Sequence, residues 1–450
     1  MKRDLIYNLV EWSKSKERKP ILLRGARQVG KSWLVRELGK SFPHFVELNF
    51  EENPDLGSFF QGNLDPKEMT TQLSNYLGTS ITPGKTLLFL DEIQACPRAI
   101  TALRYLDEKR PDLHTIGAGS LLEFELQNVS MPVGRIENLY LYPMSFGEFL
   151  TALGREDLRE HLKTNITREM PEPIHRQLLS FIRDYTIIGG MPAVVRKYIE
   201  TQNIRECQTI QTRLIETYQK DFSKYSKRSQ IKYLRLLFEA IPSQLGNKFV
   251  YSHISQEIKS REFSDALDLL EMAGVAHRVY HSSCSGVPLG ATIDLKKFKV
   301  LFFDVGLALR ILGVDVKHLF LNPDITLINK GAIAELFVGL ELIAYGDSDQ
   351  RTRLYYWHRE KRGAQSEVDY VLAVSNRIVP IEVKSGHRGR LYSLQLFLEE
   401  ERAKGGIKIS QNPFKAQGKI VELPFYGIEA VDKVIPEKGS TFSLTLPKTD

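Results

Sequence analysis

Eight residues near the amino end have the composition and spacing of a phosphate-binding loop. Residues 25–32 fit the pattern G-x-x-x-x-G-K-[ST] at every position. The glycines let the backbone curl, so that successive amides can point at phosphate oxygens. Lys31 would reach the outer phosphates and Ser32 would offer a hydroxyl to Mg²⁺. The pattern predicts ATP with Mg²⁺ as the ligand, bound by Gly25, Ala26, Arg27, Gln28, Val29, Gly30, Lys31 and Ser32.

The residues on either side have the periodicity of the elements that such a loop connects. Residues 20–23 form a short apolar run of the kind found in buried parallel strands. Residues 33–38 are apolar at helical spacing, which predicts a helix directly after the loop. The amino end of that helix would add unpaired amides and a positive dipole end to the phosphate site.

A pair of acids follows a second apolar run. Residues 86–90 predict a buried strand, and Asp91 and Glu92 come directly after it. Asp91 would hold Mg²⁺, directly or through water, at the carboxyl end of that strand. Glu92 would polarise the attacking water. The alternative is a surface acidic pair after a core strand, and the phosphate loop upstream favours the metal interpretation.

Two further polar residues could complete this site. Residues 115–120 predict a strand ending in small polar residues, which would place Ser120 to contact the terminal phosphate or orient water. Arg135 precedes the apolar residues 139–142 and could act as an arginine finger, in its own chain or toward a neighbouring subunit. An ordinary surface salt bridge explains Arg135 equally well.

A second group of charged residues lies near the carboxyl end. Strands are predicted over residues 354–357, 367–372 and 377–384. Glu382 and Lys384 are two residues apart on the last of them, so their side chains share a face.

Two more acids would lie beside this pair. Asp369 lies on the preceding strand, and Glu335 lies on a helix predicted over residues 333–345. Three carboxylates suit Mg²⁺ or Mn²⁺, so Glu335, Asp369 and Glu382 are candidate ligands of a second ion. Lys384 would position or help to deprotonate a metal-bound water. Two alternatives stay open: a hairpin with surface salt bridges, and a fold that binds without turnover.

The middle of the chain is predicted to be helical. Three amphipathic segments, 231–241, 252–258 and 263–273, precede two strands that could pair as a hairpin, which is the order of a winged-helix domain. The third segment carries three acids and no base, so phosphates would repel it and packing against protein is favoured. A basic cluster upstream is better explained as a solvated helix face: Lys220, Lys224, Lys227, Arg228 and Lys232.

The motifs together resemble a known family, the AAA-type ATPases of bacteria and archaea that carry a C-terminal domain of unknown function. The resemblance rests on the phosphate loop, on Leu90-Asp91-Glu92-Ile93-Gln94 and on further short motifs along nearly the whole chain: Gly119–Leu122, Gly134-Arg135, Tyr142–Leu150, Gly189–Pro192 and Asp304–Leu307. It implies an ATPase with a lid and linker after the nucleotide domain.

The carboxyl-terminal residues are similar to the PD-(D/E)XK nuclease superfamily. Asp369 and Glu382-Val383-Lys384 match its core motif, and Glu335 matches its first-helix acid, although no proline precedes Asp369. The resemblance implies a metal-dependent nuclease-like domain. Residues 355–357 and 359–362 would add aromatic and cationic contacts to DNA.

Composition limits the class of protein. The 450 residues are 42% hydrophobic and 26% charged, with a net charge of +6, as in a globular protein that is compatible with DNA. Residues 351–410 hold twelve Lys or Arg against seven Asp or Glu. The three cysteines lie far apart and the longest apolar runs are too short for a membrane helix, so a cytoplasmic protein without membrane contact is expected.

The predicted fold is α/β and multidomain. We expect an AAA-type ATPase core at 1–150, a helical lid or linker at 151–210, a winged-helix-like domain at 211–312, a restriction-endonuclease-like α/β domain at 313–430 and a tail at 431–450. The first functional hypothesis is an ATP-dependent protein that acts on DNA through the nuclease-like domain. The second is a nucleotide-controlled regulatory or scaffolding protein that binds DNA or a protein partner without cleavage, in which a homo-oligomer is also allowed. A protein-remodelling machine ranks third.

Overall fold

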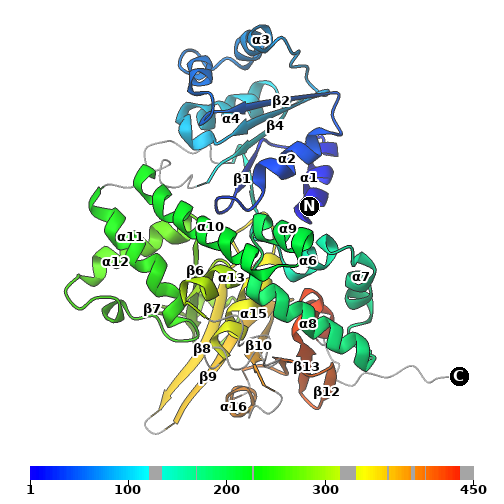
Figure 1. Cartoon of the computed structure of the whole chain (residues 1–450), viewed down its shortest axis with the longest axis vertical. Helices are drawn as coiled ribbons and strands as arrows, with labels where there is room; N and C mark the ends of the chain where they lie inside the picture. Colours follow the sequence, from blue (N-terminus) through cyan, green and yellow to red (C-terminus); the bar gives the residue numbers. More distant parts are fainter. Residues whose placement is uncertain are drawn as a thin grey trace, which may run out of the picture.

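A computed structural model describes residues 1–435 except 121–133, 169, 226–227, 315–330, 362–363, 387–390 and 401. The side chains of residues 223–229 and 360–365 are not described either. Figure 1 shows a small sheet at one end of the long axis, a larger sheet at the other end, and helices across the middle. One hydrophobic core runs through all three parts, from Leu5 to Val434. A second core fills the far face of the small sheet. The three parts are therefore packed as one body.

The amino-terminal part is a parallel sheet with the strand order β2-β3-β4-β1-β5. Its strands are β1 Ile21–Arg24, β2 His44–Asn49, β3 Thr86–Asp91, β4 His114–Ala118 and β5 Glu137–Tyr140. Its helices are α1 Leu5–Lys14, α2 Lys31–Gly39, α3 Pro66–Leu77 and α4 Pro97–Lys109, with 3₁₀ segments η1 Pro54–Phe60 and η2 Ile93–Ala95. Because these strand pairs are all parallel, the carboxyl ends of the strands lie at one edge, where ligands bind in such sheets. The predicted parallel ATPase-type sheet is confirmed.

Helices make up most of the middle region. They are α6 Phe146–Ala152, α7 Glu156–Asn165, α8 Glu172–Ile188, α9 Pro192–Thr201, α10 Ile204–Tyr225, α11 Arg228–Ala240, α12 Ser260–Met272 and α13 Val305–Ile311, with short 3₁₀ turns η3 Ile241–Gln244 and η4 Tyr251–His253. Helix α8 ends and helix α9 begins at the Gly189–Pro192 motif. Gly189 has φ +74° there, and a Cβ atom would lie 2.3 Å from Asp304 Oδ1, so a side chain would not fit.

The carboxyl-terminal part is a mixed sheet with the order β12-β13-β11-β10-β9-β8-β6-β7. Its strands are β6 Ala276–Ser282, β7 Ile293–Phe302, β8 Leu354–Lys361, β9 Ala364–Val374, β10 Arg377–Val383, β11 Gly406–Ser410, β12 Lys415–Gln417 and β13 Ile420–Pro424. It also contains α15 Ala332–Ala344, α16 Tyr392–Glu399 and the 3₁₀ segments η5 Leu289–Thr292 and η8 Phe425–Val434. The turn between β9 and β10 uses Ser375 and Asn376 at φ 48° and 62°, which suits a tight antiparallel hairpin.

The winged-helix prediction is not confirmed. Only a 3₁₀ turn, Tyr251–His253, lies where the second of the three helices was expected. The hairpin of β6 and β7 does form, but β6 also pairs in parallel with β8 through Val279–His281. The hairpin therefore belongs to the large sheet, and the domain boundary expected at 312–313 divides strands of a single sheet. The same described residues contain no helix that is long and apolar enough to cross a membrane.

Candidate functional site

The loop at residues 25–32 curls at the carboxyl end of β1. Gly25, Gln28 and Gly30 have φ values of 146°, 62° and 99°, so three backbone positions adopt the conformation that favours glycine. A Cβ atom on Gly25 would lie 2.1 Å from the carbonyl oxygen of Leu141, which only glycine avoids. Lys31 is buried, and its Nζ donates to the carbonyl oxygens of Gly25 and Ala26 at 3.0 and 2.9 Å. The ammonium of Lys31 is thus held inside the loop by neutral carbonyl dipoles.

Ser32 and Asp91 come from different elements and meet at this edge. Ser32 lies in the first turn of α2, Asp91 ends β3, and the Ser32 hydroxyl lies near enough to the Asp91 carboxyl to lower its pKa. Burial raises the pKa of Asp91 to about 6, and the Ser32 hydroxyl opposes that rise. A hydroxyl beside a carboxylate at the end of a phosphate loop is a donor set that fits Mg²⁺.

Glu92 and Ser120 lie at the same edge of the sheet. Glu92 has φ 48°, and its Oε2 accepts a hydrogen bond of 2.6 Å from Gln94 Nε2. Ser120 follows β4, the strand between β3 and β1, and is 1% exposed. Its Oγ is buried without a hydrogen-bond partner among the described residues. An orphaned hydroxyl beside the phosphate loop fits a bound phosphate or water.

Arg135 does not lie at the same edge of the sheet as the phosphate loop. It precedes the first residue of β5, which is parallel to β1, so it lies at the edge of the sheet opposite to the phosphate loop. Its guanidinium is half exposed and lies 3.7 Å from Asp107 and 3.5 Å from Glu108, near the end of α4. This placement gives no support to a finger role within its own chain; a role toward a neighbouring subunit stays a prediction.

The four predicted carboxyl-terminal residues lie close together. Lys384 Nζ is 2.5 Å from Glu382 Oε1, and the backbone amide of Val383 donates to Asp369 Oδ2 at 2.7 Å. Glu335 is buried on α15, where its own backbone carbonyl accepts from Tyr370. We call Glu335, Glu367, Asp369, Glu382 and Lys384, together with Lys299, the acidic cluster.

Lys299 was not among the predicted residues, and it lies at the centre of the acidic cluster. Its side chain is 1% exposed, and its Nζ is 2.7 Å from Glu335 Oε1, 2.5 Å from Glu367 Oε1 and 4.0 Å from Asp369 Oδ1. Among the described residues no group of three or more His, Cys, Asp or Glu is arranged to hold a metal ion. The predicted second Mg²⁺ or Mn²⁺ at Glu335, Asp369 and Glu382 is therefore not supported, because a lysine ammonium already lies among the carboxylates.

Burial dominates the electrostatics of the acidic cluster. It raises the pKa of Glu335 to about 7, although Lys299 opposes the rise. It raises the pKa of Glu382 to about 8, with Asp369 adding to the rise and Lys384 opposing it. Burial also raises the pKa of Asp369. These carboxyls are therefore costly to ionise and depend on the two lysines.

The predicted DNA contacts near β8 are only partly available. Tyr356 and Trp357 are 1% and 2% exposed, so their rings belong to the core and cannot stack on bases. Arg359 Nη1 lies 2.6 Å from Glu400. The side chains of residues 360–362 lie outside the described residues.

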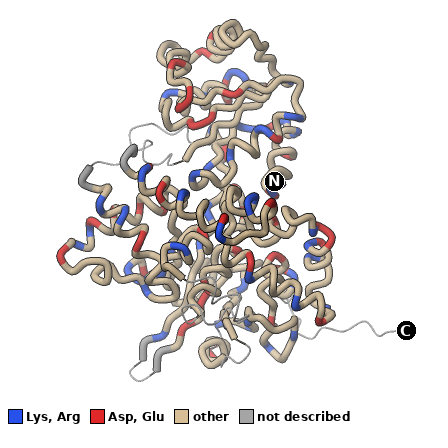
Figure 2. Tube along the Cα trace, in the orientation of Figure 1, with Lys and Arg blue, Asp and Glu red and all other residues tan. Residues whose placement is uncertain are grey.

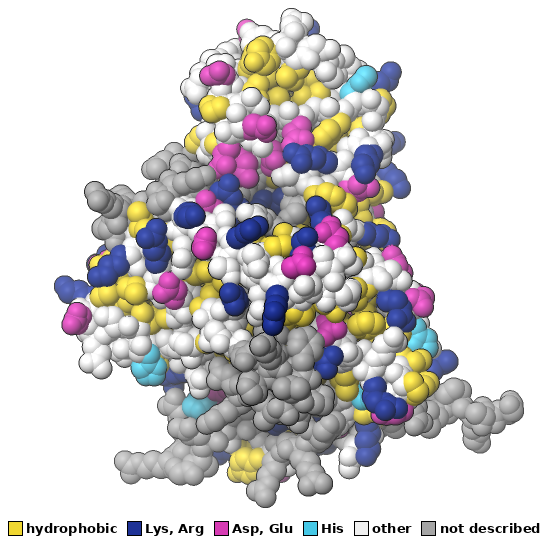
Figure 3. Space-filling model, viewed as in Figure 1, with side chains coloured by type: hydrophobic (Ala, Val, Ile, Leu, Met, Phe, Trp, Pro, Cys, Tyr) yellow, Lys and Arg dark blue, Asp and Glu magenta, His cyan; other side chains and the backbone are white. Residues whose placement is uncertain are grey.

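The upstream basic cluster can be judged only in part. Lys220 and Lys232 are exposed, whereas the side chains of Lys224, Lys227 and Arg228 lie outside the described residues. Along the trace, basic and acidic residues alternate (Figure 2). On the face shown in Figure 3, Lys and Arg of the helical region are mixed with acidic and hydrophobic side chains. This pattern is typical of a solvated protein surface.

Some of the missed residues left a signal in the sequence. Lys299 lies between Phe298 and Val300, where the strand becomes apolar, and a charged residue in such a place is buried only when it is paired. Gln94, which holds Glu92, is part of the quoted motif but had no assigned role.

Comparisons with known proteins assign the parts of the chain. Residues 17–150 match the model of a family described as AAA domain. Residues 180–318 and 330–426 match two families described as domains of unknown function, DUF8612 and DUF4143. A comparison with curated proteins gives no match.

Several solved structures match this chain at low identity. PCH-2 of C. elegans is 14% identical, with 45% of this chain and 64% of PCH-2 covered, at a TM-score of 0.28. ORC1 of Aeropyrum pernix, solved in complex with DNA, is 13% identical, with 69% and 90% covered, at 0.29. A signal transduction ATPase with numerous domains from Pyrococcus horikoshii is 12% identical, with 74% and 47% covered, at 0.26. At such TM-scores these likenesses say nothing about function.

The matched families and the parallel sheet agree on the amino-terminal part. The chain combines an amino-terminal P-loop ATPase domain of the AAA type with two following domains of unknown function.

Proposed function

We propose that the protein binds ATP with Mg²⁺ at the phosphate loop and hydrolyses it. The observation that carries this proposal is the contact between Ser32 and Asp91, which joins the loop to the end of β3. Ser32 and Asp91 would hold Mg²⁺, and Lys31 would exchange its carbonyl partners for phosphate oxygens. A magnesium ion bound there would neutralise charge on the phosphates.

Two more side chains would act on the water. Glu92, held by Gln94, would accept a hydrogen bond from the attacking water and orient it. The buried hydroxyl of Ser120 would donate to the terminal phosphate or to that water.

Substitution of Lys31 by alanine tests the site. We expect Lys31→Ala to weaken ATP binding by about 100-fold, because it removes the charge that faces the phosphates. Isothermal titration with Mg²⁺ and ATP measures the change. Lys40→Ala is the control: this lysine is nine residues further along, its side chain is 73% exposed and its partner is a surface glutamate. Unchanged binding in Lys31→Ala would refute the assigned site.

For the carboxyl-terminal region we propose nucleotide-controlled binding of a partner without cleavage. The supporting observation is the position of Lys299, whose ammonium supplies the positive charge that Glu335 and Glu367 require. The surplus of Lys and Arg in residues 351–410 makes DNA the first partner to test.

One observation keeps metal-dependent cleavage as a second candidate. Glu382 is 3% exposed, and its Oε2 is buried without a hydrogen-bond partner among the described residues. A carboxylate oxygen of this kind next to Asp369 could still bind a cation if Lys299 moved away.

A cleavage assay separates the two candidates. Purified protein is incubated with single- and double-stranded DNA, Mg²⁺ or Mn²⁺, with and without ATP. We expect DNA to remain intact. Cuts that Asp369→Ala eliminates would overturn the binding-only proposal and establish Asp369 in a nuclease site.

A further inference from the structure

Two buried side chains from outside the phosphate loop donate hydrogen bonds to its backbone carbonyls. Nη1 of Arg3 donates to the carbonyl oxygen of Val29 at 2.5 Å. The hydroxyl of Tyr218 donates to the carbonyl oxygen of Arg27, also at 2.5 Å. Arg3 and Tyr218 are 3% and 5% exposed, so water does not compete effectively for these bonds.

Peptide geometry gives these bonds a consequence. Both peptides are trans, because the cis peptide of the described residues is Val287–Pro288. In a trans peptide the carbonyl and the next amide point to opposite sides. With the carbonyls of Arg27 and Val29 held toward Tyr218 and Arg3, the amides of Gln28 and Gly30 face away from those side chains. A loop of this type binds phosphate through amides that point inward together.

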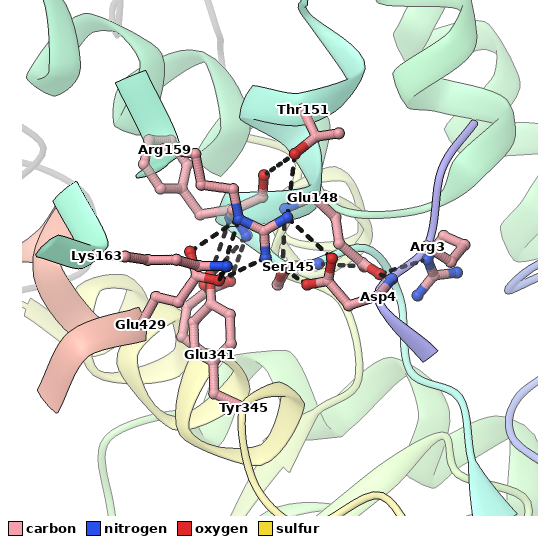
Figure 4. Close-up of polar contacts among 12 residues, drawn as sticks. Arg3, Asp4, Ser145, Glu148, Thr151, Arg159, Lys163, Glu341, Tyr345 and Glu429 are labelled. Carbon is pink, nitrogen blue, oxygen red and sulfur yellow. Dashed lines mark hydrogen bonds and ion pairs between the residues drawn. The ribbon is translucent and has the colours of Figure 1, made fainter. Parts of the chain in front are cut away.

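Neither donor belongs to the sheet or to the helix after the loop. Arg3 precedes α1 and is fixed by Glu148 Oε1 at 3.0 Å and by the carbonyl of Tyr142 at 2.7 Å. Glu148 Oε1 also accepts from the backbone amide of Asp4. The Asp4 side chain pairs with Arg159, as Figure 4 shows.

This network continues into the carboxyl-terminal part. Arg159 pairs with Glu429 of η8, and Lys163 lies 3.0 Å from the same carboxylate (Figure 4). The position of Arg3, and through it the Val29 carbonyl, is thus tied to a segment more than 400 residues away in sequence.

Tyr218 belongs to α10, in the middle region. Its ring packs on Phe238 and Phe303, with centroid distances of 6.0 and 5.0 Å. Asp221, one turn further along α10, lies 3.0 Å from Nη1 of Arg27. The helix therefore holds Arg27 of the loop at both its backbone and its side chain.

We propose that Tyr218 and Arg3 are positioning residues of the ATP site, which hold two loop peptides with their carbonyls outward and so preorganise the amides of Gln28 and Gly30 for phosphate. The inference rests on the proposed ATP function. It makes the domain of unknown function at 180–318 part of the nucleotide site, since Tyr218 lies within it.

The test compares two tyrosine-to-phenylalanine variants of the full chain. Tyr218→Phe removes only the hydroxyl that contacts the loop. Tyr185→Phe is the matched control, because that buried hydroxyl donates to the carbonyl of Met144 at the same 2.5 Å. ATP affinity with Mg²⁺ is measured by titration, ATP turnover by phosphate release, and stability by thermal unfolding.

We expect Tyr218→Phe to raise the Kd for ATP by about three- to tenfold. KM should rise by a similar factor while kcat stays unchanged, because bound nucleotide itself holds the amides once the site is filled. Arg3→Lys keeps a positive charge but lacks the planar guanidinium whose three nitrogens reach Glu148, Val29 and Tyr142, so it should weaken binding in the same direction.

Two outcomes would overturn the inference while leaving the ATP site intact. One is a Kd for Tyr218→Phe within twofold of the wild type. The other is an equal loss in Tyr185→Phe, which would assign the effect to general loosening of the fold. If the wild-type protein itself fails to bind ATP, the proposed function falls, and this inference falls with it.

Discussion

Two buried lysines, Lys31 in the phosphate loop and Lys299 in the large sheet, differ in the groups that surround their ammonium ions. Lys31 Nζ is bound by the carbonyl oxygens of Gly25 and Ala26, which are neutral dipoles. Lys299 Nζ is bound by the carboxylates of Glu335 and Glu367. The first ammonium lies in the phosphate loop beside backbone carbonyl oxygens, whereas the second lies among carboxylates in the large sheet.

The comparison distinguishes a lysine that donates to neutral carbonyls, as suits a site that binds an anionic ligand, from a lysine whose charge is balanced by carboxylates of the protein. Neutral partners are readily exchanged for phosphate oxygens, because little electrostatic energy is lost when they leave. Carboxylate partners in a buried cluster are held tightly, since removing one charge leaves the other uncompensated. The sequence alone does not distinguish the two cases, because the acids that surround Lys299 come from distant segments of the chain.

The largest effect that would test this comparison is expected at Lys299. We expect Lys299→Met to lower the free energy of unfolding by about 3–5 kcal/mol, because the buried carboxylate of Glu335 and the partly buried carboxylate of Glu367 lose their counter-charge. Urea unfolding followed by circular dichroism measures the loss.

Lys408→Met provides the control for this experiment. Lys408 is also buried, but its partner Glu422 accepts further hydrogen bonds from Ser410 and Asn412 and stays satisfied. The control should lose clearly less stability. A loss below about 1 kcal/mol in Lys299→Met would mean that the acidic cluster does not depend on this lysine.

A medium effect is expected from the pH dependence of the nucleotide site. The pKa of Asp91 is raised to about 6, and Mg²⁺ requires the ionised carboxylate. The contribution of Mg²⁺ to ATP affinity should therefore be constant above about pH 7 and fall by about tenfold at pH 5. Titrations with ATP in Mg²⁺ and in EDTA across this range measure it.

Asp91→Asn is the reference for that measurement, since the titration of ATP itself is the same in both proteins. The difference between wild type and variant isolates the carboxylate. If both proteins show the same pH profile, Asp91 does not hold the metal.

The smallest effect is expected in the pH dependence of stability that Glu382 of the acidic cluster causes. Burial raises the pKa of Glu382 to about 8 in the folded protein, whereas the ordinary value in an unfolded chain is 4.5. The contribution of Glu382 to the free energy of unfolding therefore falls as the pH rises from about 4.5 to about 8. The side chain in Glu382→Gln stays neutral at every pH. The melting temperature of the variant minus that of the wild type should therefore be about 2–4 °C larger at pH 9 than at pH 5. Glu257→Gln, at an exposed position, should show no such gain.

Much of the nucleotide edge could be predicted from the sequence because its information is local. The loop, the following helix and the apolar run before Asp91 each lie within a few residues, and parallel strands bring their ends together. These local patterns predict that Ser32 and Asp91 lie near each other, as they do in the structure. The hairpin turn at Ser375 and Asn376 also depends on residues that are adjacent in the sequence.

The parts that could not be predicted depend on contacts between distant segments. Lys299 reaches an acid 36 residues away in the chain, and no spacing rule connects a strand lysine to a helix glutamate. Tyr218 and Arg3 contact backbone atoms, which leave no mark in the sequence. The winged-helix expectation failed because hairpin strands have the same alternation whether they form a free wing or pair with a larger sheet.

The pairing of β6 with β8 decides how this polypeptide can be divided. The two families of unknown function are matched as separate segments, yet Val279–His281 of the first is hydrogen-bonded to Leu354–Tyr356 of the second. A truncated protein that ends between them would expose an unpaired strand edge, and exposed strand edges promote aggregation. Residues 276–426 should therefore be expressed together, although they span two matched families.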